Sequence, residues 1–221
     1  PLSMGSGFVI GNNIIATNYH VIENGGGGFV KLIGSDKKYQ ISGIIEKNER
    51  LDLAILVVNG LVAPKLSFGD FNKVEVGELV YAIGNQSGLE GTFSQGIVSG
   101  IRTIGDEKLL QITAPISPGS SGGPVVNSNG EVIGIAVATL TNGQNLNFAI
   151  PANYLNDLYL NGNKLPKPLS NITSSNSTGS FFESLGHNII EELNPVLFKW
   201  TSNQFMGKYT FSIKNNLNKA I

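Results

Sequence analysis

Short runs of apolar, mostly β-branched residues, each ended by turn residues, recur from residue 5 to about residue 151 and constrain the fold more than any other feature. Turn pairs such as Asn129-Gly130 and Asn142-Gly143 separate the runs, and Asn and Gly accept the positive φ angles of tight hairpins. Almost no helical periodicity lies between them, whereas a parallel sheet needs crossover helices. The pattern therefore predicts an all-β, antiparallel sandwich or barrel. The eleven expected strands cover residues 7–10, 14–17, 29–33, 39–45, 53–58, 79–83, 92–101, 109–113, 124–127, 132–138 and 145–150.

Charge and composition exclude several classes of protein. The 221 residues include 15 Lys and Arg against 16 Asp and Glu, a net charge of −1. This balance argues against a nucleic-acid or anionic-membrane partner, because both usually require a basic excess. No apolar run approaches the roughly 18 residues that a membrane span needs. The chain has no cysteine, so disulfides, thiolate metal sites and a thiol nucleophile are excluded.

The periodicity changes after the eleventh run. Pro151 suits a first helical turn, and apolar residues follow at helical spacing, which predicts a closing helix over residues 151–160. Residues 166–180 are rich in Pro, Ser, Asn and Thr and are typical of a linker. We therefore expect one domain over residues 1–165, followed by that linker.

The last residues, 181–221, are predicted to form a helix and a strand. Ser180 and Glu183 form a capping box, and the apolar face that follows ends before Pro195. Residues 209–213 lie in a stretch that alternates between apolar and polar side chains, the period of a strand.

Three segments carry residues that catalysis can use. His20 follows a predicted strand, Asp52 begins one, and Ser121 lies in a glycine-rich turn. Glycines on both sides of a serine let the backbone approach a substrate and let successive N–H groups point the same way. Each feature alone also has a plainer interpretation, namely a structural histidine, a turn aspartate and a simple hairpin. Asp36 and Asp70 lie in turn-like, polar surroundings and are weaker candidates.

Taken together, these residues have a recognisable order. His20, Asp52 and Ser121 follow the order of the chymotrypsin-type triad and not that of subtilisins or α/β-hydrolases. The segments around them are GSGF (5–8), TNYHV (17–21), DLA (52–54), GSSGGP (119–124) and NFAIP (147–151). Over residues 5–160 the sequence resembles the chymotrypsin-fold, trypsin-like serine endopeptidases, nearest the HtrA/Deg-type branch.

The resemblance implies a fold and a set of roles. The fold is two packed six-stranded antiparallel barrels with a short C-terminal helix, barrel one over about residues 5–90 and barrel two over about 91–151. Ser121 would be the nucleophile, His20 the base, and Asp52 the residue that orients the imidazole. The loop of Gly119, Ser120 and Ser121 would form the oxyanion hole, with the N–H groups of Gly119 and Ser121 as donors. No metal and no organic cofactor is required.

The resemblance also indicates which residues line the substrate pocket. Asp and Glu are absent from residues 114–123, whereas a trypsin-like pocket needs a carboxylate at its base. We therefore expect a protein or peptide substrate cleaved after small or medium aliphatic residues. The expected walls are Ile116 near the base and, facing it, Ala136, Val137, Ala138, Thr139 and Leu140.

The chain also departs from the family pattern. Two six-stranded barrels need twelve strands, and the strand at 209–213 is a candidate for the twelfth, within one chain or across a dimer. Residues 166–221 are too few for a PDZ-like domain. An activating partner or a homo-oligomer stays open, and the resemblance favours an extracytoplasmic location. The alternative function is a catalytically idle protease fold that acts as a protein-binding module.

Overall fold

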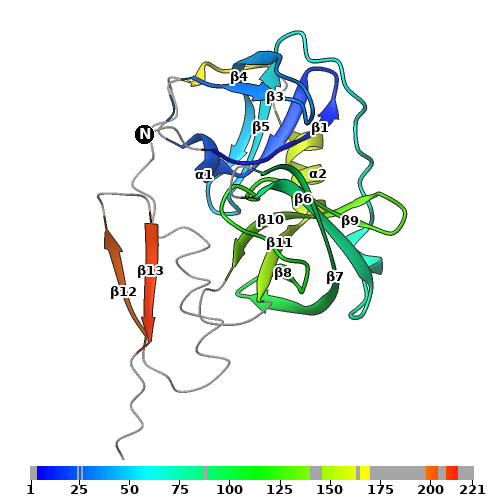
Figure 1. Cartoon of the computed structure of the whole chain (residues 1–221), viewed down its shortest axis with the longest axis vertical. Helices are drawn as coiled ribbons and strands as arrows, with labels where there is room; N and C mark the ends of the chain where they lie inside the picture. Colours follow the sequence, from blue (N-terminus) through cyan, green and yellow to red (C-terminus); the bar gives the residue numbers. More distant parts are fainter. Residues whose placement is uncertain are drawn as a thin grey trace, which may run out of the picture. The chain divides into compact units, whose positions relative to one another are not determined.

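Eleven strands between Phe8 and Pro151 form the core of the computed structural model (Figure 1). It describes residues 4–23, 25, 27–86, 89–139, 146–162, 165–169, 198–203 and 208–213. The chain divides into two units, Pro1–Ser177 and Thr178–Ile221. The eleven strands correspond one to one with the eleven predicted runs, and the all-β, chymotrypsin-like fold class is confirmed.

The first half of the larger unit is an antiparallel sheet of five strands in the order β1-β2-β5-β4-β3. A one-turn helix, α1 (Tyr19–Ile22), begins two residues after the last residue of β2, Thr17. Apolar side chains from every strand pack beneath the sheet, among them Val9, Ile15 and Leu56. The five strands are β1 (Phe8–Gly11), β2 (Ile14–Thr17), β3 (Phe29–Lys31), β4 (Lys38–Asn48) and β5 (Leu53–Val58).

The second half closes into a barrel of six strands in the order β10-β11-β8-β7-β6-β9. Closure leaves no unpaired edge, and alternate side chains point inward. On β7, for example, Val98 is fully buried while Phe93 and Ile97 are exposed. The strands are β6 (Leu79–Gln86), β7 (Leu89–Ile104), β8 (Glu107–Ile112), β9 (Pro124–Asn127), β10 (Val132–Thr139) and β11 (Asn147–Pro151), and a 3-10 turn, η1 (Phe71–Lys73), precedes them.

The boundary between the halves differs from the prediction. We expected barrel one to extend to about residue 90, but β6 already belongs to the second barrel, where it pairs with β7 and β9. The boundary therefore lies between β5 and β6. The cause is long-range pairing, because a strand's own sequence does not show which neighbours it bonds to.

After the barrel, the chain returns to the first half. The predicted closing helix is present as α2 (Ala152–Asn161), and the side chain of its residue Leu155 is fully buried. Farther on, Lys167 and Ile44 of β4 exchange two backbone hydrogen bonds of 2.8 Å each, and Leu169 joins the core of the first half. The first residues of the expected linker at 166–180 are thus packed on β4, and its residues 170–180 lie outside the described part of the chain.

The smaller unit contains a two-stranded antiparallel sheet. β12 (Phe198–Asn203) pairs along its length with β13 (Lys208–Ile213). The strand expected at 209–213 is therefore present, and its partner β12 was not predicted. The suggestion that the strand at 209–213 completes the first barrel stays a prediction. The helix expected within residues 181–221 lies outside the described residues.

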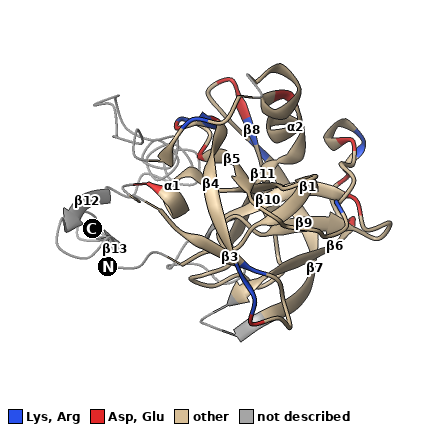
Figure 2. Cartoon of the chain, turned by 90° about the horizontal axis from the view of Figure 1, so that it is seen from above, with Lys and Arg blue, Asp and Glu red and all other residues tan. Residues whose placement is uncertain are grey.

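Two further properties complete the description. Among the described helices, none has the length and apolar character needed to span a bilayer. Figure 2 shows Lys and Arg interspersed with Asp and Glu along the described loops. Residues of both charge signs are thus distributed over several short segments of the chain.

Candidate active site

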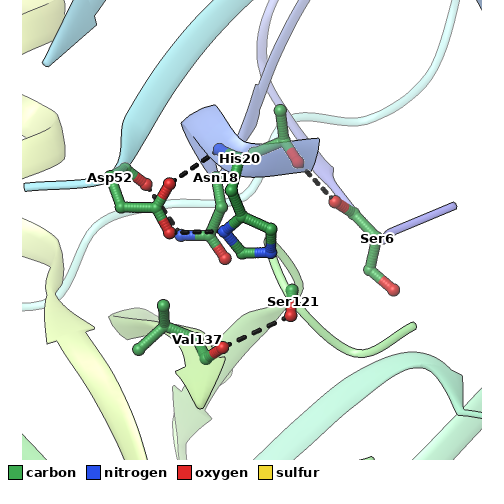
Figure 3. A network of polar contacts seen from close by, with 7 residues as sticks. Ser6, Asn18, His20, Asp52, Ser121 and Val137 are labelled. Carbon is green, nitrogen blue, oxygen red and sulfur yellow. Dashed lines mark hydrogen bonds and ion pairs between the residues drawn. The ribbon is translucent and has the colours of Figure 1, made fainter. Parts of the chain in front are cut away.

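His20 and Asp52 are joined by a short polar contact between their side chains. His20 is the second residue of α1, and Asp52 lies immediately before β5. The Nδ1 atom of His20 is 2.6 Å from Oδ2 of Asp52, and the backbone N–H of His20 donates to Oδ1 at 2.7 Å (Figure 3). An ionised carboxylate can only accept hydrogen bonds, so this contact places the imidazole proton on Nδ1. The Nε2 atom is then left as a proton acceptor.

The backbone of Asp52 is in an unusual conformation. Its φ angle is +53°, in the left-handed region, which costs a residue with a Cβ roughly 1–2 kcal/mol. The Asp52 carbonyl accepts hydrogen bonds from Nδ2 of Asn18 at 2.8 Å and from the N–H of Tyr19 at 3.1 Å. Asn18 is fully buried. These bonds offset the backbone strain and fix the Asp52 carboxylate beside Nδ1 of the imidazole.

The electrostatic surroundings of His20 favour its charged form. Partial removal of water from the ring would by itself lower the pKa of His20, but the hydrogen bond to Asp52 and the negative charges of Asp52 and Glu23 outweigh this effect. The pKa of His20 is consequently raised above its ordinary value near 6.5. Because 45% of its side chain is exposed, the ring is also open to an incoming molecule.

The glycine-rich segment forms a type II turn just before Ser121. The N–H of Ser120 donates to the carbonyl of Ser117 at 2.9 Å, Pro118 is the second residue, and Gly119 has a φ angle of +98°. Type II turns need a positive φ at the third position and accept proline at the second. This turn type determines the direction of the Gly119 N–H.

The three residues expected in the oxyanion hole therefore differ in whether their backbone N–H groups are free to donate a hydrogen bond. The N–H of Ser120 is used to close the turn, so Ser120 is not a free donor. The N–H groups of Gly119 and Ser121 have no acceptor among the described residues. Gly122 and Gly123 then attach the loop to β10 of the barrel: the N–H of Gly122 donates to the carbonyl of Ala136 at 2.9 Å, and the N–H of Ala136 donates to the carbonyl of Gly123 at 2.8 Å.

Ser121 lies beside His20, on the side of the ring away from Asp52 (Figure 3). Its hydroxyl donates to the carbonyl of Val137 on β10 at 3.3 Å and is turned away from the imidazole. Rotation about one side-chain bond redirects a serine hydroxyl, and catalytic hydrogen bonds are often long or misaligned without substrate. The structure thus brings together the three residues that the sequence placed in a triad.

The expected pocket residues are only partly described. Ile116 and Val137 are each 8% exposed, and Ala136 is 1% exposed. Ala138 and Thr139 continue β10, and Leu140 lies outside the described residues. Ile116, Ala136 and Val137 are thus the pocket residues whose side chains the structure describes, and all three are apolar.

Two residues of the site were not singled out from the sequence. Asn18 holds the carbonyl of Asp52, as described above, and Ser6 bonds to the loop that carries Ser121. Both lie inside the segments TNYHV and GSGF, so the sequence marked their neighbourhood but not their contacts.

Comparison with known proteins identifies the family. Residues 5–135 match the trypsin-like peptidase domain. The chain belongs to the trypsin-like peptidase family. A probable periplasmic serine endoprotease, DegP-like, from Brucella suis is 41% identical over 165 residues, covering 69% of this chain and 31% of the relative. The anti-sigma-I factor RsgI9 of Acetivibrio thermocellus is 35% identical over 160 residues, covering 71% of this chain and 22% of the relative.

Solved structures support the same assignment. The HtrA-type protease AlgW with decapeptide superposes with a TM-score of 0.66 at 27% identity, covering 71% of this chain and 50% of that chain. The serine endoprotease from Yersinia pestis superposes with a TM-score of 0.63 at 30% identity, and the match covers 71% of this chain and 56% of that chain. The resemblance to the HtrA/Deg-type branch is confirmed. The chain spans only about a fifth to a third of the length of the two curated relatives.

Proposed function

We propose that this protein is a serine endopeptidase that cleaves peptide bonds through an acyl-enzyme on Ser121. The observation that carries the proposal is the 2.6 Å contact between His20 Nδ1 and Asp52 Oδ2, with Ser121 on the other side of the imidazole. Membership of a serine protease family supports the same activity.

The proposed reaction begins when the Ser121 hydroxyl attacks the substrate carbonyl carbon. Nε2 of His20 takes the hydroxyl proton, and Asp52 stabilises the imidazolium that forms. The imidazolium then gives its proton to the leaving amine as the C–N bond breaks, which leaves an ester on Ser121. Water, deprotonated by the same imidazole, hydrolyses the ester and restores the hydroxyl.

The negative oxygen of each tetrahedral intermediate needs donors that are already in place. We assign this role to the N–H groups of Gly119 and Ser121, which the type II turn and the barrel contacts hold at the two sides of Ser120. Removing one such donor costs about 2.7–4 kcal/mol of transition-state stabilisation in related chemistry.

For specificity, we propose cleavage after small or medium aliphatic residues such as Val, Ala, Ile or Leu. Ile116, Ala136 and Val137 are apolar and largely buried, so none of these three side chains could pair with a charged substrate side chain. A peptide library with varied residues before the scissile bond tests this, and a strong preference for Arg or Lys would contradict it. We also propose an extracytoplasmic location, because the DegP-like relatives are described as periplasmic.

The function itself is tested by labelling with a fluorophosphonate probe, followed by intact-mass measurement. Wild-type protein should gain one adduct, and Ser121→Ala should gain none. The matched control is Ser42→Ala, because Ser42 is an exposed serine that bonds to Val57 in the first half. No adduct on folded wild-type protein would contradict the proposal and favour an idle fold that binds other proteins.

A further inference from the structure

Ser6 lies just before β1 and uses all of its polar groups in bonds to three separate segments. Its hydroxyl donates to the carbonyl of Gly119 at 2.6 Å and accepts the N–H of Asn85 at 2.9 Å. Its backbone N–H donates to the carbonyl of Ser121 at 2.8 Å, and its carbonyl accepts the hydroxyl of Thr17 at 2.7 Å. One residue of the first half therefore contacts both ends of the Gly119–Ser121 loop.

The backbone around Ser6 is closely packed. A Cβ atom on Gly84 would lie 3.0 Å from the Ser6 hydroxyl oxygen and 3.1 Å from Cα of Ser120. A Cβ atom on Gly122 would lie 2.3 Å from the Ser6 carbonyl oxygen and 2.3 Å from the Thr17 hydroxyl. Glycine at these two positions thus lets β6 and the serine loop approach Ser6.

The hydrogen bond from the Ser6 hydroxyl to the Gly119 carbonyl restrains a peptide whose orientation the glycine itself does not fix. Glycine adopts either sign of φ with little penalty, so its conformation has to be set by its surroundings. In the peptide that joins Gly119 to Ser120, the carbonyl bonds to Ser6 and the N–H bonds to Ser117. Both sides of this peptide are held, and it lies between the two proposed oxyanion donors.

Ser6 also connects this loop to the segment that carries the base. Thr17, which bonds to the Ser6 carbonyl, ends β2 three residues before His20. We propose that Ser6 is a positioning residue for the proposed peptidase reaction: its hydroxyl fixes the N–H groups of Gly119 and Ser121 relative to His20. The inference rests on the proposed function, and it assigns Ser6 no direct contact with the substrate.

The test compares the kinetics of fluorophosphonate labelling among wild type, Ser6→Ala, Ser6→Thr and Ser42→Ala. In Ser6→Ala, the maximal labelling rate should fall about 10- to 100-fold, because a shifted oxyanion donor weakens transition-state stabilisation. The probe concentration at half-maximal rate should change by less than about threefold, since the pocket is intact. Ser6→Thr retains a hydroxyl and should recover most of the rate, and Ser42→Ala should match wild type.

The outcomes separate this inference from the proposed function. Failure of folded wild-type protein to label contradicts the function itself. A wild-type labelling rate in folded Ser6→Ala overturns the positioning role, as does a loss of thermal stability without a loss of rate. If Ser6→Ala does not fold, Ser6→Cys replaces it, because a thiol is a weak donor. Slow labelling of Ser6→Cys beside fast labelling of Ser6→Thr supports the inference, and equal rates overturn it.

Discussion

The two halves of the larger unit hold their parts of the site in different ways. The second half is a closed barrel, and the Ser121 loop is attached to it by the bond from Gly122 to Ala136. The first half is a five-stranded sheet that is not closed, and its strand β3 leaves the Phe29 side chain 49% exposed. There, His20 and Asp52 are fixed by bonds among a few neighbouring residues. The Ser121 loop is thus bonded to a closed barrel and also to Ser6 of the first half, whereas His20 and Asp52 are held by hydrogen bonds within the first half.

Removal of the carboxylate at Asp52 should have the largest effect. Asp52→Asn should lower the labelling or hydrolysis rate by about 10⁴-fold, because an amide can stabilise the wrong imidazole tautomer and cannot offset its charge. Circular dichroism should show an intact fold. As a control, Asp70→Asn alters a carboxylate that caps η1 away from the site, and it should leave the rate unchanged. Comparable losses in both variants would refute the role of Asp52.

The pH dependence of the reaction should report the state of His20. The imidazole accepts a proton only when neutral, so kcat/KM should rise about 10-fold per pH unit below the pKa of His20 and level off above it. Since Asp52 and Glu23 raise the pKa of His20 above about 6.5, the midpoint should lie above that value. Glu23→Gln should move the midpoint downward. An unchanged midpoint in that variant would show that Glu23 does not affect the base.

An ion pair between the halves provides a third test. Arg50, in the turn before β5, contacts the nearly buried carboxylate of Glu107 at the start of β8. Arg50→Met should reduce the free energy of unfolding by about 1–3 kcal/mol, because it leaves a buried charge without its partner. Urea titration, with Lys65→Met as a control for loss of charge, measures this effect.

The stability that this pair contributes should depend on pH, because the pKa of Glu107 is raised in the folded state. Burial raises the pKa of Glu107 above its usual value, and Arg50 counteracts part of that rise. The folded state therefore binds the proton more tightly than the unfolded state, and stability falls as pH increases from the ordinary Glu value through the raised one. Without Arg50 the pKa of Glu107 rises further, so the loss in Arg50→Met should be greater at pH 7 than at pH 5. An equal loss at both values would contradict this account.

The smallest effect is expected at Asn18. Asn18→Ala removes the bond to the Asp52 carbonyl and should cost about 1 kcal/mol of stability. If local bonds hold the base, the labelling rate should fall as well. Ser42→Ala removes a hydroxyl-to-carbonyl bond elsewhere in the same sheet and serves as the control. An unaffected rate in folded Asn18→Ala would show that the left-handed Asp52 is held by other contacts.

Local sequence patterns predicted the parts of this structure that depend on neighbouring residues. Turn residues located the eleven strands, and the glycines on both sides of Ser121 marked the turn that carries it. Features that depend on distant residues were not predictable in the same way. The pairing of β6 with β9 moved the boundary between the halves, and the bond between Ser6 and Gly119 spans 113 positions. No periodicity encodes such contacts. Aspartate adopts a positive φ more often than most residues with a Cβ, but its residue type does not by itself determine the left-handed conformation of Asp52.

The return of the chain to β4 determines how the domain would bear a mechanical load. Lys167 comes after both halves of the domain in sequence, and it exchanges two backbone hydrogen bonds with Ile44 of β4. Tension applied to the chain after Leu169 therefore reaches Lys167 and β4 before it reaches α2 or the barrel. The sheet that carries His20 and Asp52 therefore takes this pull before the barrel that carries Ser121.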